Sequence, residues 1–168
     1  LPIMIGLRLS GEGHIFYIQE RVGKGNKPFS IWKFATMLKD SPNMSGGIIT
    51  TQRDPRILPM GGFLRKTKIN ELPQLINVLK GDMSVVGPRP HPLALNQSYA
   101  SRIDAYMQRH KVKPGITGWA QIHGFRGETE TLEKMQRRIE YDLYYIQHWS
   151  LWMDIKIIVF TVFAGWTG

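Results

Sequence analysis

The stretch Leu64–Pro90, LRKTKINELPQLINVLKGDMSVVGPRP, carries the signals that decide the fold. Apolar residues recur in it at helical spacing and predict a helix with one apolar face, at positions 72, 75, 76 and 79. Asn70 is a favoured N-cap residue and Gly81 a favoured C-terminal cap, so we expect the helix to lie between them. The run from 83 to 86 that follows is typical of a short strand.

Two charged side chains in this stretch suit the binding of an anion. Glu71 stands at the predicted helix start, where unsatisfied backbone N–H groups and the helix dipole favour a group such as phosphate. Arg89 lies between two prolines whose fixed φ angles present it rigidly, and a guanidinium can bind phosphate in a bidentate manner. Taken alone, the pair Asn70-Glu71 is most simply a helix cap, and Asp82 a structural turn residue.

The segments before this stretch predict a hairpin and a loop. Strand-forming residues at 15–19 and 29–34 enclose the turn 23–26. Residues 39–52, rich in Ser, Pro, Gly and Asn, are expected to form a loop. With the helices that follow, we expect a mixed α/β (α+β) fold that is mostly helical, with one small β-hairpin and no large sheet.

The segments after it predict three helices. Helical spacing indicates one over 93–109, and another over 132–149 that Thr129 or Thr131 can cap. A third is expected after Ser150. The polar face of the second is expected to carry Lys134, Arg137, Arg138 and Glu140.

The segment Val112–Gln121, VKPGITGWAQ, contains a proline and two glycines, which argue against a helix there. Basic residues cluster around it, at positions 109, 111, 113 and 126. This cluster is either a solvated basic face or a contact for diphosphate or lipid phosphate.

Composition narrows the function. The length of 168 residues suits one domain, and a net charge of +9 implies an anionic partner such as nucleic acid, an anionic membrane face or phosphorylated substrates. The sequence lacks the motifs of RNA-binding, helix-turn-helix and zinc-finger proteins, so we expect no nucleic-acid partner. It contains no cysteine, which excludes disulfides and thiolate catalysis. The longest apolar run, 155–166, is shorter than the roughly 20 residues that cross a bilayer.

Several ordered motifs carry a family resemblance: the opening stretch, QERVG at 19–23, KFATM at 33–37, DPR at 54–56 and VKPGITGWAQ. Together they closely resemble the bacterial sugar transferase family, the monotopic polyprenyl-phosphate phosphoglycosyl transferases. The resemblance implies that residues 1–9 are the remnant of a re-entrant membrane helix and 10–168 the catalytic domain. It also implies interfacial amphipathic helices, and a location on the cytoplasmic face of the bacterial cytoplasmic membrane. Self-association into a homo-oligomer is compatible with these features.

The resemblance also implies a reaction. A sugar 1-phosphate, glucose or galactose, would pass from a UDP-sugar to undecaprenyl phosphate and release UMP, with Mg²⁺ as the metal. Such a transfer primes exopolysaccharide synthesis. Members of the family are held to pass the sugar phosphate through an aspartyl intermediate.

Carried over residue by residue, the resemblance places the catalytic pair at Asn70 and Glu71, with Glu71 also a ligand of Mg²⁺. The substrate-binding residues are then expected to be Lys33, Arg56, Arg65, Arg89, Gln121 and Arg126.

Two positions depart from the family pattern. Asn70 stands where the nucleophilic aspartate is expected, and Ala35 replaces an arginine. An amide is a poor acceptor of a phosphoryl group, so three accounts stay open: an inactive form, Glu71 as nucleophile, or transfer without a covalent step. The first would make the chain a catalytically impaired relative that acts as a substrate-binding or membrane scaffold.

The C-terminal aromatic residues have two interpretations. Such stripes usually form a core, but Trp and Tyr beside basic residues also suit the headgroup layer of a membrane. Given the net charge and the resemblance, we expect part of this surface to lie at a membrane.

Overall fold

A computed structural model describes residues 2–10, 14–38, 55–125 and 131–164. The chain divides into two compact units, the first formed by residues 1–18 and 32–73, the second by 19–31 and 74–168. The described part is mostly helical with two two-stranded sheets, so the expected mixed α/β fold is confirmed. The predicted loop 39–52 and Arg126 lie outside the described residues.

The first unit packs two helices together, α1 (Pro2–Ser10) and α2 (Pro59–Lys66). Leu7 of α1 and Leu64 of α2 are fully buried. A Cβ added to Gly61 would lie 2.2 Å from the Thr36 carbonyl oxygen, so α2 can approach that backbone only through a glycine. The 3₁₀ turn η3 (Ile69–Glu71) follows α2.

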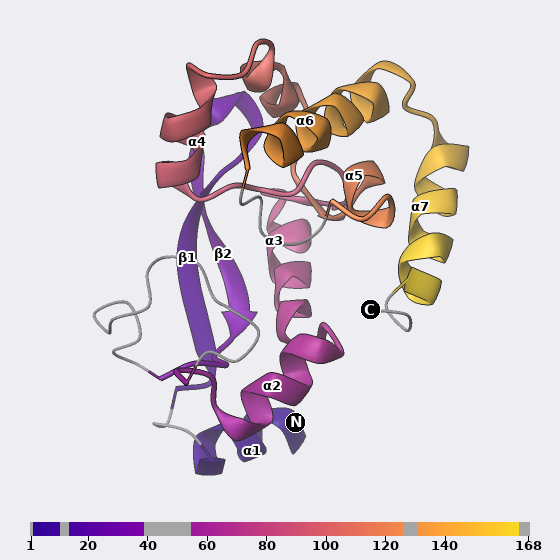
Figure 1. Cartoon of the computed structure of the whole chain (residues 1–168). Coiled ribbons are helices and arrows are strands. Elements are labelled where there is room, and N and C mark those ends of the chain that lie inside the picture. Colours follow the sequence, from indigo (N-terminus) through magenta and orange to yellow (C-terminus); the bar gives the residue numbers. More distant parts are fainter. Residues whose placement is uncertain (1, 11–13, 39–54, 126–130, 165–168) are drawn as a thin grey trace. The chain divides into compact units, whose positions relative to one another are not determined.

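The predicted hairpin is confirmed and is longer than expected. Strands β1 (Phe16–Val22) and β2 (Pro28–Phe34) pair with each other and are joined by the 3₁₀ turn η1 (Lys24–Asn26) (Figure 1). Its base belongs to the first unit and its tip to the second.

The second stretch of the second unit opens with α3 (Gln74–Lys80), which is followed by Gly81 with φ +85°, as predicted. The predicted strand is also confirmed. It is β3 (Ser84–Val86), and it pairs in parallel with β4 (Gly115–Thr117), Val86 opposite Thr117.

The prediction that one helix starts at Asn70 is wrong. Lys68 has φ +61°, so the chain closes the separate turn η3 before α3 begins at Gln74, after Pro73, which has no N–H to donate. The buried side of α3 is its polar side. Its polar residues Gln74 and Asn77 are buried, and the apolar residues of its predicted stripe are exposed.

Two further predictions need correction. The helix expected over 93–109 is two elements, α4 (Leu93–Ala100) and the 3₁₀ helix η4 (Tyr106–Lys111), because Ala105 turns the backbone to φ +60°. The segment predicted to exclude a helix ends in the short helix α5 (Trp119–Ile122).

The last two helices, α6 (Leu132–Gln147) and α7 (Leu151–Ala164), are confirmed (Figure 1). The Thr131 hydroxyl caps α6 by accepting the Lys134 N–H at 3.2 Å. Arg138, predicted on the exposed polar face of α6, is instead buried. Asp142, one helical turn later, is buried too, so α6 places two charged side chains in the interior of the second unit.

The core of the second unit lies beneath α6 and α7. One buried cluster joins Met135 and Ile139 to Ile103 and Tyr106 of the preceding segments. A second joins Val86, Tyr145 and Ile157. Within the described residues, no helix is long and apolar enough to cross a membrane.

Candidate active site

The pair Asn70-Glu71 is held in a tight turn. The Thr67 hydroxyl donates to the Phe63 carbonyl at 2.9 Å at the end of α2. The left-handed Lys68 then lets its own carbonyl accept the Glu71 N–H at 3.0 Å. This local geometry fixes the backbone of both members of the pair.

Lys33 of β2 contacts Glu71. Lys33 Nζ lies 3.6 Å from Glu71 Oε1, and the two side chains are only 15% and 10% exposed. Because little water surrounds the two groups, their Coulomb attraction is screened less than that of a pair on the surface. The structure therefore brings together two residues that the family motifs predicted for one site.

Asn70 presents an oxygen that no other residue of the described part of the chain binds. Its Oδ1 is buried and has no hydrogen-bond partner among the residues that the structure describes. Buried polar atoms are rarely left so, and each exception calls for an explanation such as a missing water or ion.

The oxygens of this pair fit a hard cation. Mg²⁺ prefers oxygen ligands and is usually held by one or two carboxylates together with water and substrate phosphates. Glu71 offers a carboxylate, and the adjacent Asn70 an unpartnered amide oxygen. No group of three or more acidic or histidine side chains gathers as a metal site in the described ranges. Water and substrate would therefore have to supply the rest of the coordination shell.

The other substrate-binding residues predicted in this unit, Arg56 and Arg65, lie where the backbone around residue 37 pairs with the backbone around residue 57. The Leu38 N–H donates to the Arg56 carbonyl at 2.9 Å, and Met37 forms a bridge with Ile57. Arg56 is buried. Arg65 Nη1 contacts the Thr36 hydroxyl at 3.5 Å.

Ala35, where the family carries an arginine, is buried. Its N–H donates to the Ile15 carbonyl at 2.9 Å. This position therefore supplies packing and no cation.

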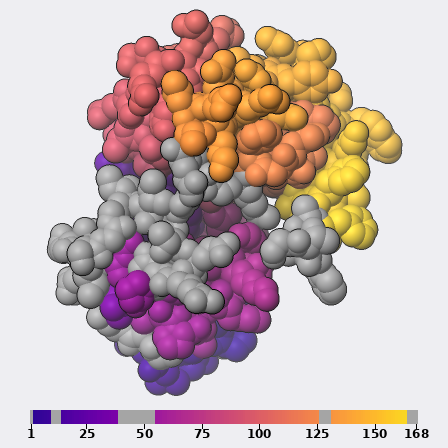
Figure 2. Space-filling model, viewed as in Figure 1, coloured from indigo at the N-terminus to yellow at the C-terminus, as the bar shows by residue number. Residues whose placement is uncertain are grey.

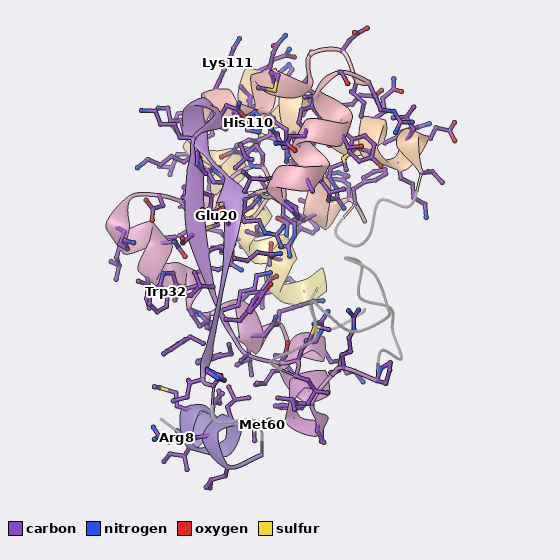
Figure 3. The ribbon with its side chains drawn as sticks, turned by 90° about the vertical axis from the view of Figure 1, so that its left-hand side faces the viewer. Arg8, Glu20, Trp32, Met60, His110 and Lys111 are labelled. Atoms are coloured by element: carbon purple, nitrogen blue, oxygen red, sulfur yellow. The ribbon has the colours of Figure 1, made fainter. Side chains whose placement is uncertain are left out.

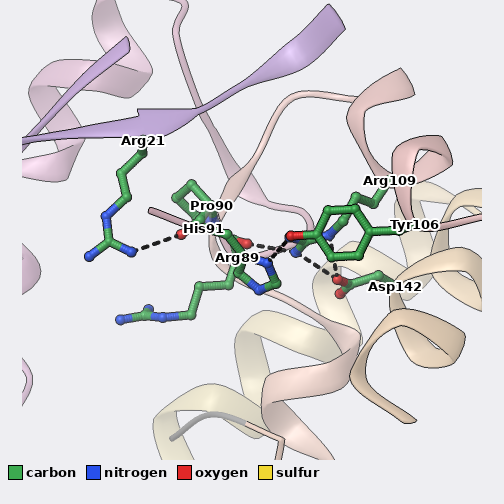
Figure 4. Close-up of polar contacts among 7 residues, drawn as sticks. All are labelled: Arg21, Arg89, Pro90, His91, Tyr106, Arg109 and Asp142. Atoms are coloured by element: carbon green, nitrogen blue, oxygen red, sulfur yellow. Dashed lines mark hydrogen bonds and ion pairs between the residues drawn. The ribbon is translucent and has the colours of Figure 1, made fainter. Parts of the chain in front are cut away.

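In the second unit, the segment around Arg89 is fixed by its own carbonyls (Figure 4). The carbonyls of residues 88 to 91 each accept one hydrogen bond, in order from the Gly115 N–H at 2.9 Å, Arg109 Nη2 at 2.7 Å, Arg21 Nη1 at 3.3 Å and the Val22 N–H at 3.0 Å. The predicted rigidity of Pro88-Arg89-Pro90 thus comes from these bonds as well as from the prolines.

A buried ion pair anchors this segment. Arg109 Nε and Nη2 lie 3.1 and 2.8 Å from Asp142 Oδ2, and both side chains are almost completely buried. Burial raises the pKa of the Asp142 carboxyl, while Arg109 acts in the opposite direction. Burial, and next the charge of Arg89, lower the pKa of Arg138 to about 10. The Asp142 carboxylate therefore pairs directly with Arg109, and the charge of Arg138 acts on it as well.

A buried histidine, His91, lies close to this ion pair. His91 Nδ1 and the Tyr106 hydroxyl share a hydrogen bond of 2.6 Å. Burial, and next the charge of Arg109, hold the pKa of His91 well below its usual value, so His91 is neutral at pH 7.

Sequence reasoning missed the roles of Arg109 and Asp142. A signal was available for Asp142, because it falls three residues after the buried Ile139 and so lies on the apolar side of α6. Nothing local connects it to Arg109, which is 33 residues away.

Gln121 is buried, and its Nε2 donates to the Ile116 carbonyl at 3.3 Å. Its amide nitrogen is therefore engaged within the fold, while its Oε1 finds no hydrogen-bond partner in the described ranges. Gln121 and Arg89 both belong to the second unit, whereas Lys33, Arg56, Arg65, Asn70 and Glu71 belong to the first.

The sequence matches known proteins over its whole length. The profile of the bacterial sugar transferase family matches residues 1–168. A protein of Escherichia coli (strain K12), UDP-glucose:undecaprenyl-phosphate glucose-1-phosphate transferase, is 55% identical over 163 residues, which are 97% of this chain and 35% of that protein.

Two further relatives carry other names. The UDP-N-acetylgalactosamine-undecaprenyl-phosphate N-acetylgalactosaminephosphotransferase of Aeromonas hydrophila is 40% identical over 99% of this chain and 40% of its own length. The exopolysaccharide production protein PSS of Rhizobium leguminosarum bv. phaseoli is 42% identical over 99% of this chain and 85% of its own length. The chain spans about a third of the first relative and most of the last. It belongs to the bacterial sugar transferase family.

Proposed function

We propose that this chain transfers glucose 1-phosphate from UDP-glucose to undecaprenyl phosphate and releases UMP, the priming step of exopolysaccharide synthesis. The observation that carries the proposal is the buried contact of Lys33 with Glu71 inside the family motifs. Glucose is preferred to other sugars because three relatives at 50 to 55% identity are named for it, while the relative named for N-acetylgalactosamine is 40% identical. The relatives' names give no support to the scaffold alternative.

Lys33, Glu71 and Asn70 have different roles in this reaction. Lys33 supplies a cation that offsets the charge of the diphosphate, and Glu71 and Asn70 Oδ1 would hold Mg²⁺. When bound, Mg²⁺ neutralises negative charge on the diphosphate oxygens. Arg65 and Arg89 are further cations for the substrates.

We propose that the transfer is direct. Glu71 is almost buried and engaged by Lys33, which suits a metal ligand better than an attacking group, and the Asn70 amide is uncharged. An oxygen of undecaprenyl phosphate then attacks the β-phosphorus of UDP-glucose as the bond to the UMP oxygen breaks. UMP departs with the electron pair of that bond, and the sugar phosphate ends on the lipid.

UMP release tests the reaction and the route together. With UDP-glucose and Mg²⁺, direct transfer requires that UMP appear only when undecaprenyl phosphate is present. The Asn70→Asp variant restores the family's nucleophile and should give a burst of UMP, about one per chain, without acceptor. A similar burst from the unaltered chain would refute direct transfer and indicate Glu71 as nucleophile. If neither chain releases UMP with acceptor present, the proposed activity is wrong.

We also propose that the chain binds the cytoplasmic face of the bacterial cytoplasmic membrane. Helix α7 exposes a large apolar surface, and its side chains form a continuous part of the face seen in Figure 2. The exposed members are Leu151, Trp152, Ile155, Ile158, Val159, Phe160, Val162 and Phe163. Lys156 lies among them, 5.5 Å from the Trp119 ring centroid. Aromatic residues beside a cation suit the headgroup layer.

Sedimentation with vesicles tests this proposal. The chain should bind vesicles of phosphatidylglycerol, and Trp152→Ser with Phe163→Ser should weaken binding roughly tenfold or more, because two large apolar side chains no longer enter the bilayer. Tyr17→Ser with Ile18→Ser removes exposed apolar residues from the hairpin and is the matched control. Equal losses in the two double variants would argue against α7 as the membrane contact.

A further inference from the structure

A recess at the tip of the hairpin belongs to none of the sites described above. It lies where η1 packs against η4, and Figure 3 shows His110 and Lys111 beside the hairpin turn. The residues that line it are Lys24, Gly25, Asn26, Met107, His110 and Lys111. All of them belong to the second unit.

The turn that forms one wall is held in place by hydrogen bonds. The Gly23 N–H donates to the Lys27 carbonyl at 2.8 Å, which closes the turn. Asn96 Nδ2 of α4 donates to Asn26 Oδ1 at 3.1 Å, so a third element fixes the tip. Gly25 has φ +67° and no atom within 4 Å of the place a Cβ would take, so the space beside its Cα is unfilled.

The charged residues that line the recess are all basic. Lys24 and Lys111 contribute two exposed ammonium groups from opposite walls, and none of the lining residues is acidic. His110 is only 7% exposed, and none of the described residues forms a hydrogen bond with its Nε2. Burial, and next the charge of Arg109, lower the pKa of His110 to about 4, so at pH 7 it offers hydrogen bonding and no charge.

We propose that this recess binds a phosphate group, as a free phosphate or as the headgroup of an anionic lipid. Lys24 and Lys111 supply the attraction, and Asn26 and His110 are the neutral polar groups beside them. Met107 adds an apolar surface for whatever carries the phosphate. Lys111 belongs to the basic cluster around residues 112–121, and no other lining residue is assigned to the transfer reaction, so the recess is a second anion site of the chain.

Titration with inorganic phosphate, followed by the amide resonances of the chain in NMR spectra, tests the site. We expect saturable shifts centred on Gly25 and Lys111. The double variant Lys24→Ala/Lys111→Ala should weaken phosphate binding roughly tenfold through the loss of two charged contacts. Lys27→Ala/Lys113→Ala is the matched control, because it removes the same charge from the same two segments but from residues that do not line the recess.

Vesicles separate the two sources of phosphate. If lipid headgroups occupy the recess, Lys24→Ala/Lys111→Ala reduces binding to phosphatidylglycerol vesicles more than the control pair does. If the ligand is a free phosphate, the two double variants bind vesicles equally and differ only in their affinity for inorganic phosphate. The proposal would be overturned if the two double variants bound inorganic phosphate equally and vesicles equally, or if the NMR shifts never saturated.

Discussion

Helices α3 and α6 show the same apolar periodicity in sequence and use it in opposite ways. In α6, Met135 and Ile139 of the stripe are fully buried in the core of the second unit. In α3, the stripe is exposed, with Leu79 at 88%, and the opposite face buries Asn77, whose Nδ2 donates to the Ser30 carbonyl at 2.7 Å. Periodicity therefore identifies the residues that share a face, but it does not tell whether that face meets the core.

The buried charge on α6 should give the largest effect. In the Arg109→Ala variant, Asp142 stays buried without its partner and the Arg89 carbonyl loses its donor. We expect a loss of about 3–5 kcal/mol in the free energy of unfolding, measured by urea denaturation. The matched control is Arg137→Ala, an exposed arginine of α6, which should change little. A loss under 1 kcal/mol for Arg109→Ala would mean that the pair does not anchor this unit.

The apolar stripes give the direct contrast. Met135→Ala leaves a cavity in the core and should lower the free energy of unfolding by about 2–5 kcal/mol. Leu79→Ala removes a side chain that contacts mainly solvent, so its effect should stay within about 0.5 kcal/mol. Urea denaturation of both variants checks this pair. A large loss in Leu79→Ala would show that the stripe of α3 is buried in solution.

A smaller effect should appear with pH. His110 is held neutral in the folded chain, with a pKa of about 4, against 6.5 when exposed. Below pH 6.5 the unfolded chain takes up a proton that the folded chain does not, so stability is lost as pH falls from 6.5 to 4, at most about 1.4 kcal/mol per pH unit.

Urea denaturation of His110→Gln between pH 7 and 5 isolates this contribution. The variant should lose less stability over that range than the unaltered chain. His148→Gln, at an exposed position, is the control and should follow the unaltered chain. If His110→Gln shows the same pH dependence as the control, the histidine is not held neutral by the fold.

Local signals predicted much of the fold. The hairpin turn with Gly25, the cap at Gly81 and the stripe of α6 depend on neighbouring residues, and all three are confirmed. The split at η3 depends on the left-handed backbone of Lys68, a conformation that a lysine does not signal. The exposed face of α3 depends on contacts of Asn77 far along the chain.

The candidate site, too, was predicted only in part from the sequence. The family motifs predicted Lys33 and Glu71 separately, and the fold brings them within 3.6 Å. The bond from Arg109 to the Arg89 carbonyl and the pair with Asp142 join distant segments, so no spacing in the sequence reveals them.

The most direct measurement of the central claim is UMP release from UDP-glucose with undecaprenyl phosphate and Mg²⁺, comparing the unaltered chain with Glu71→Gln. The substitution keeps the shape of the side chain but removes the charge that contacts Lys33 and would hold Mg²⁺. We predict that UMP release falls roughly 100-fold or more, while Glu133→Gln, an exposed carboxylate of α6, has no effect. Turnover by Glu71→Gln within twofold of the unaltered chain would contradict the assignment of this site.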